Sequence, residues 1–188
     1  MNKKVLIGIV VALIVLMIAL IWFTDAESKL KYSLNADGVS YSVIGIGFSF
    51  DSNLVIPSEY KGLPVTRIGD YAFNGNGDKI KSVVIPDSVK IIGEHAFEAL
   101  DLTELILSNS LTHIGEMAFA GQVGLESIRI PNSVKIIGDG AFFFSWSLSK
   151  IYFDGTVKEW HLIRLGSAWN AEVPATKVIC SDGTVTLK

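Results

Sequence analysis

The chain has 188 residues, with 16 basic and 19 acidic side chains and a net charge of −3 at neutral pH. This length suits one domain with an accessory segment, and the excess of acid argues against nucleic-acid binding, which needs a basic stripe. Cys180 is the only cysteine, so an internal disulfide is excluded and the fold must be stable without one.

Residues 1–26 are predicted to be a membrane anchor, or an uncleaved signal. Residues 5–23 carry no charge, and at about 1.5 Å per residue a helix of this length spans roughly 28 Å, close to the hydrocarbon core of a bilayer. Lys3 and Lys4 precede it, which places the N-terminus in the cytoplasm and the rest outside. The alternative is a signal peptide that is cleaved near Ala26. Both interpretations put residues 27–188 outside the cytoplasm.

Residues 27–56 are expected to close the N-terminal end of the fold as a capping hairpin. Two runs, 41–44 and 53–56, are rich in strand-forming residues. Asp37-Gly38 is typical of the tight turn between two strands.

Residues 57–155 contain an internal repeat. The phrase Ile-Gly-x-x-Ala-Phe occurs four times, at intervals of 24, 22 and 23 residues, beginning at Ile68, Ile92, Ile114 and Ile137. We expect the glycine to accommodate a tight bend and the alanine to let neighbouring turns approach. The isoleucine and phenylalanine should point inward, because stacked turns share one continuous core.

A second pattern, apolar-x-x-apolar-x-apolar, is interleaved with the first. Its copies are Ile80-Val83-Ile85, Leu102-Leu105-Leu107, Leu125-Ile128-Ile130 and Leu148-Ile151-Phe153. This pattern and its period are typical of leucine-rich repeats. The sequence therefore predicts a leucine-rich-repeat solenoid with one short parallel β-strand in each turn of 22–24 residues.

These phrases resemble the BspA-like leucine-rich repeats of bacterial surface proteins, over about residues 40–188. The resemblance is carried by 84–89, Ile92-Gly93, Ala96-Phe97 and their counterparts in the other copies. It implies a solenoid displayed at a cell surface. Many repeats of that family have a cysteine shortly after the phenylalanine, and any role of that cysteine is absent here, where the region holds Asn76, Gln122 and Ser145.

Residues 156–188 are expected to cap the C-terminal end. Thr156 and Glu159 have capping-box spacing, which predicts a helix that runs through Ile163 and ends at Gly166. A hairpin of 178–180 and 184–186 should follow, with its turn at Asp182-Gly183.

No arrangement of residues predicts catalysis, a metal site or a cofactor site. The three histidines, His95, His113 and His161, fall at unrelated positions, and no Cys/His spacing matches a metal site. The chain has neither a phosphate-binding loop nor a nucleophile elbow. We therefore do not expect an enzyme.

Two further features have both a structural and a functional interpretation. A carboxylate follows each repeat glycine and could bind a cation, although solvated turn residues have the same pattern: Asp70, Glu94, Glu116 and Asp139. Cys180 is either a reactive thiol or a partly buried strand residue, and nothing nearby in the sequence is positioned to lower its pKa.

The outward strand positions are the main candidate for partner binding. Stacked strands should align Val55, Val84, Ile106, Arg129 and Tyr152 on one sheet face, with Glu104 and Lys150 beside them. Apolar side chains followed by arginine and tyrosine are typical of interface cores. Ordinary β-propensity would also place branched residues there.

A secondary candidate is the aromatic run Phe143, Phe144 and Trp146, which has no counterpart in the other turns. Exposed aromatic side chains in a turn can mark a partner site. Alternatively, they fold over the last turn and pack against Trp160 of the cap.

These features favour a monomeric, non-catalytic protein at the cell surface that recognises a protein or glycan partner. The alternatives are a carbohydrate- or cell-wall-binding module, a structural spacer, and an envelope enzyme. No nucleic acid is expected as a partner, and residues 5–23 are the expected contact with the membrane.

Protease treatment of intact cells is expected to remove residues 27–188 and to leave a short stub in the membrane fraction, because the anchor shields the N-terminus. Immunoblotting of an N-terminal epitope tag measures the stub, and a cytoplasmic protein serves as the control for intact membranes. A soluble product that begins near Glu27 would establish the cleaved signal peptide instead.

Overall fold

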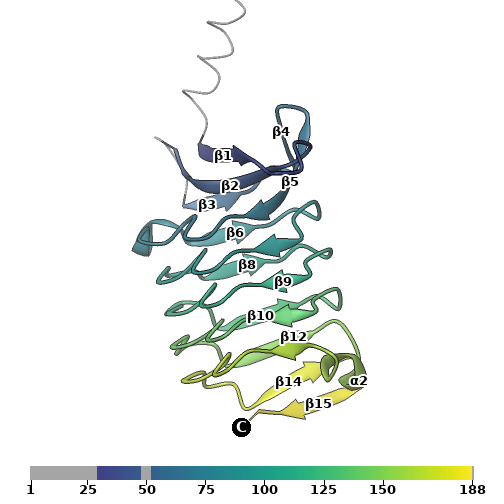
Figure 1. The fold of residues 1–188 in the computed structure, drawn as a ribbon. Helices are drawn as coiled ribbons and strands as arrows, with labels where there is room; N and C mark the ends of the chain where they lie inside the picture. The colour runs from purple at the N-terminus through teal and green to yellow at the C-terminus, as the bar shows by residue number, and fades with distance from the viewer. Residues whose placement is uncertain (1–28, 48–51, 188) are drawn as a thin grey trace, which may run out of the picture.

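The computed structural model describes residues 29–47 and 52–187. The predicted anchor, residues 5–23, lies outside the described residues. Among the residues described, no helix is long and apolar enough to cross a membrane. The described chain is a column of stacked turns with a hairpin at one end and a short helix with a second hairpin at the other (Figure 1).

The first side of the column, here called the strand face, carries the predicted parallel strands. β3 (Asn53–Val55), β6 (Ser82–Val84) and β8 (Glu104–Ile106) form one sheet. β10 (Ser127–Ile130), β12 (Lys150–Phe153) and β14 (Lys177–Cys180) form another, which β15 (Gly183–Thr186) extends. All pairs are parallel except β14 with β15. The predicted leucine-rich-repeat solenoid is confirmed.

A second sheet, which the sequence did not predict, covers another side of the column and is called the second face. Its strands from β5 onward pair in parallel, and those after β5 have two residues each: β5 (Leu63–Ile68), β7 (Ile91–Ile92), β9 (His113–Ile114), β11 (Ile136–Ile137) and β13 (Arg164–Leu165). Each turn therefore contributes a strand to both faces. The second strand of each turn ends directly before the repeat glycine.

The third side, called the turn side, is joined by backbone hydrogen bonds without forming strands. The repeat phenylalanine donates its N–H to the carbonyl of the next turn's alanine, at 2.8 Å from Phe73 to Ala96 and 2.9 Å from Phe97 to Ala118. The repeat glycine does not adopt a left-handed conformation. Its role is close approach, because a Cβ on Gly115 would lie 2.6 Å from the backbone of Gly93.

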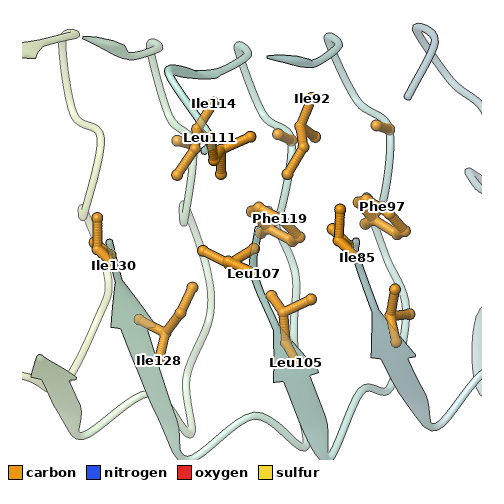
Figure 2. Close-up of a cluster of buried hydrophobic side chains, with 14 of the residues drawn as sticks. Ile85, Ile92, Phe97, Leu105, Leu107, Leu111, Ile114, Phe119, Ile128 and Ile130 are labelled. Atoms are coloured by element: carbon orange, nitrogen blue, oxygen red, sulfur yellow. The ribbon is translucent and has the colours of Figure 1, made fainter. Parts of the chain in front are cut away.

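The core is a column of apolar side chains that repeat from turn to turn (Figure 2). The four repeat phenylalanines are fully buried, and successive rings stack with centroids 5.0, 5.3 and 5.6 Å apart. Trp169 meets Phe142 edge-on at 6.1 Å and ends this column. Stacked rings contribute both apolar burial and ring–ring attraction.

Polar side chains stand where many family repeats have cysteine, and those of Gln122 and Ser145 are buried. Gln122 donates to the carbonyl of Phe97 at 2.6 Å, and Ser145 donates to that of Phe119 at 3.0 Å. Asn76 donates to the carbonyl of Phe73 at 2.7 Å. These side chains satisfy the phenylalanine carbonyls, which would otherwise lose a hydrogen bond on burial.

The N-terminal cap is the expected hairpin. β1 (Leu30–Leu34) and β2 (Tyr41–Ile46) are antiparallel, and β2 also pairs in parallel with β5 of the second face. The short β4 (Glu59–Tyr60) folds against β5, and a 3₁₀ turn at Gly77–Lys79 precedes β6. Tyr32 stacks on Tyr60 at 3.8 Å, with Tyr41 edge-on. Burial and the neighbouring Tyr60 raise the pKa of Tyr32 to about 12.

The C-terminal cap begins with the predicted capping box, but its helix is shorter than predicted. α2 spans Val157–Trp160 only, with Thr156 and Glu159 exchanging hydrogen bonds. The backbone N–H and the hydroxyl of Thr156 both donate to the Glu159 carboxylate and lower the pKa of that carboxyl. The helix ends early because Arg164 donates its N–H to Lys135 at 2.9 Å and continues the second face as β13.

Phe119→Ala is expected to lower the free energy of unfolding by about 3–5 kcal/mol, as for other buried aromatic side chains. The ring is fully buried between Phe97 and Phe142, so its loss leaves a cavity in the stack. Urea denaturation followed by circular dichroism measures the change. The exposed Val55→Ala is the control, and a loss below about 1 kcal/mol at Phe119 would mean that the stack does not stabilise the fold.

Candidate functional site

The strand face presents the predicted outward residues in two aligned columns. Val55, Val84 and Ile106 are partners in the register of β3, β6 and β8. Arg129 and Tyr152 are partners in the register of β10 and β12. Ile106 is 48% exposed and Val55 66%, whereas the residues on either side of each point inward. The predicted alignment is thus present within each sheet.

The two charged candidates lie in the adjacent outward column. Glu104 pairs in register with Ser82, and Lys150 with Ser127. Both side chains are exposed. They flank the apolar column and supply polar groups at its rim.

Arg129 is held in place by two neighbours. Its guanidinium lies 4.9 Å from the ring centroid of Tyr152, and its Nη1 is 2.6 Å from Oδ1 of Asp154. Asp154 is not among the residues that the repeat pattern predicted for this face. It occupies the position that follows the strand, where Pro57, Pro86 and Pro131 stand in other turns, and this departure from the repeat is the signal that could have identified it.

The two sheets of the strand face are not joined to each other. Among the described residues, no ladder of backbone hydrogen bonds connects β8 to β10, although β9 and β11 of the same turns are paired. A pocket of about 290 Å³ opens at this interruption. Its lining combines apolar, amide and charged groups from three turns: Leu105, Ile106, Leu107, Asn109, Arg129, Pro131 and Asp154. The interruption therefore brings Ile106 and Arg129 to one concave site.

The aromatic run on the turn side does not pack against the cap. Trp160 contacts Phe153 and Trp169, with ring centroids at 5.3 and 5.7 Å. Phe144 is 43% exposed and Trp146 61% exposed. The expectation of packing against Trp160 is therefore wrong, because Trp169 occupies the space beside that ring.

The remaining candidates have structural roles. Asp70 accepts the backbone N–H of Glu94 at 3.0 Å and Asp139 that of Ser167 at 2.8 Å, so these two carboxylates join successive turns. Cys180 is buried in β14, and burial together with the charge of Asp182 raises the pKa of its thiol. Within the described part of the chain, no group of three metal-ligating side chains is assembled.

The repeats match a known family by sequence. The family described as BspA type leucine rich repeat region matches residues 53–162 in 6 copies. The chain belongs to this family. Proteins with BspA-type repeats are generally found at the cell surface.

Solved structures share this fold. A leucine-rich repeat protein from Bacteroides capillosus is 31% identical with a TM-score of 0.59, and the match covers 68% of this chain and 95% of that one. A leucine rich cell surface protein from Faecalibacterium prausnitzii is 28% identical with a TM-score of 0.61, covering 74% of this chain and 41% of that one. A leucine-rich repeat protein from T. pallidum is 25% identical with a TM-score of 0.53, covering 74% and 79%. No curated protein matches the chain.

Arg129→Ala is expected to change the free energy of unfolding by less than about 1 kcal/mol, because exposed ion pairs contribute little in water. Its side chain is 62% exposed, and the contact with Tyr152 is also on the surface. Urea denaturation at low and high salt checks this. A loss of about 3–5 kcal/mol, as for a broken buried pair, would show that the Arg129–Asp154 pair supports the fold rather than a binding surface.

Proposed function

We propose that this BspA-type protein is a non-catalytic recognition module at the cell surface and that it binds another protein through the strand face. The pocket at the interruption between β8 and β10 carries this proposal. There, exposed Ile106 adjoins Arg129, whose orientation is set by Tyr152 and Asp154.

The chemistry of the pocket suits a protein partner. Arginine and tyrosine are the side chains most often found as binding hot spots, especially beside an apolar anchor. Arg129 is already oriented by its neighbours, so less side-chain entropy is lost when it meets a partner. Glu104 and Lys150 add charges of both signs at the rim, where charges select partners more than they add affinity.

The fold separates recognition from stability. Inward residues of a solenoid are committed to packing, while the outward columns can vary without loss of the core. The family assignment and the printed description of the Faecalibacterium prausnitzii relative as a cell surface protein support a surface location. Attachment through residues 5–23 is part of this proposal.

Arg129→Ala with Tyr152→Ala is expected to weaken partner binding more than tenfold, or about 1.4 kcal/mol, and to leave thermal stability nearly unchanged. The full chain is immobilised and exposed separately to host surface proteins and to cell-wall glycans. Partners that the wild-type chain retains are then titrated by surface plasmon resonance against both forms.

The matched control is Lys90→Ala with Lys135→Ala, two exposed residues next to the second face, which should bind as the wild type does. Retention of cell-wall glycans alone would favour the carbohydrate-binding alternative. If Phe143→Ala with Trp146→Ala abolishes binding of a folded protein and the strand-face variant does not, the main site is the aromatic turn and the proposal is wrong.

A further inference from the structure

The turn side carries an aromatic cluster, Phe143, Phe144 and Trp146, that the strand-face proposal does not use and of which Phe144 and Trp146 are exposed. The rings of Phe143 and Phe144 stack at 3.9 Å, and those of Phe144 and Trp146 lie 5.6 Å apart at an angle of 50°. One turn earlier the corresponding residues are Ala120, Gly121 and Val123. The cluster is therefore an addition to the repeat and not part of its pattern.

The backbone at Phe144 is unfavourable for a bulky side chain. Its φ of 56° lies in the left-handed region, which favours glycine and costs free energy for other residues. Gly75, Ala99 and Gly121 hold the corresponding position in three other turns, with φ of 77°, 54° and 72°. The stacking of turns imposes this conformation, because Phe144 donates its N–H to Ala171 of the next turn at 3.2 Å.

Packing of the Phe144 ring against the rest of the fold adds little stability to offset this strain. Phe144 is 43% exposed and Trp146 61% exposed, so much of both side chains remains in water. Exposed apolar area lowers stability, and exposed aromatic side chains in a turn can mark a partner site. The geometry therefore indicates a role outside the folded chain itself.

The charges around the cluster indicate which partner fits. Three stretches stack here, 115–126, 138–149 and 166–175, and together they contain no lysine or arginine. They contain four carboxylates, Glu116, Glu126, Asp139 and Glu172, of which Glu116 and Asp139 line pockets at the second face together with Arg164. Glu172 occupies the same left-handed position as Phe144, one turn later. By contrast, Lys135 and Arg164 lie on the second face of these turns.

We propose that Phe143, Phe144 and Trp146 form a second docking surface, separate from the strand face, for a basic segment of a partner protein. Lysine and arginine combine an apolar stem with a cationic head, and the head is attracted to the face of an aromatic ring. The carboxylate of Glu172, at the same position one turn later, complements the same cations and disfavours an acidic partner. The cluster and its surroundings therefore select for one chemistry.

The test uses the full chain and a synthetic peptide of alternating arginine and glycine, titrated by isothermal calorimetry. A peptide of alternating glutamate and glycine is the charge control, and a soluble N-acetylglucosamine oligomer tests for a glycan site. The arginine peptide is expected to bind, more weakly at high salt, and the other two are not. Phe144→Gly with Trp146→Ala should weaken the arginine peptide about tenfold, and Glu172→Gln by a smaller factor.

Phe144→Gly also separates binding from folding. Glycine suits the left-handed backbone, as Gly121 does one turn earlier, so the melting temperature of Phe144→Gly should stay unchanged or rise. Ile106→Ala on the strand face is the matched control and should bind the arginine peptide as the wild type does.

Three results would overturn the proposal. The first is no binding of the arginine peptide. The second is binding that survives loss of the aromatic rings and depends on the carboxylates alone. The third is binding of the glycan oligomer that is lost in Phe144→Gly with Trp146→Ala, which would make the cluster a carbohydrate site. None of these results bears on the strand face, so this inference and the proposed function can fail separately.

Discussion

Backbone hydrogen bonds between successive turns hold each repeat position in a fixed column, and the rest of the structure depends on them. On the turn side, two positions of each turn are in the left-handed conformation. Glycine occupies the first of them only once, in the series Tyr71, His95, Met117, Gly140 and Ala168. A non-glycine residue there costs free energy, which the surrounding fold must offset. The stacked phenylalanines provide that stabilisation, because the same bonds bring their rings into contact.

The sequence predicted the parts of the fold that repeat without change. The period placed Ile92, Phe97 and their counterparts in the core, and the alternation placed Ile106 and Arg129 on the surface. It did not predict that β2 and β13 extend the second face, because those turns have lost the exact phrase and their pairing depends on the neighbouring turn. The early end of α2 has the same cause, since a capping box determines where a helix starts and tertiary pairing determines where it ends.

Both candidate surfaces lie where the repeat changes. Asp154 replaces the usual proline and orients Arg129, while Phe144 stands where glycine would be unstrained. The residues of these sites could be picked out from the sequence, but their environment could not. The pocket beside Ile106 depends on a gap between two sheets, and the exposure of Trp146 depends on Trp169 occupying the space beside Trp160. Rules that rest on the local sequence therefore do not predict the structure around the two sites for which a function is proposed.

The gap between β8 and β10 also determines how the column responds to force. Each turn of a solenoid couples only to its neighbours, so a pull along the axis is carried in series by the interfaces between turns. The interface between these two turns retains the pairing of β9 with β11 and the 2.8 Å bond from Phe119 to Ala141, but it lacks the strand-face ladder. When several interfaces carry the same force in series, the weakest interface separates first. A partner that pulls on one end of the column while the other end is held would thus open the protein into two blocks, parting between Ile106 and Ser127.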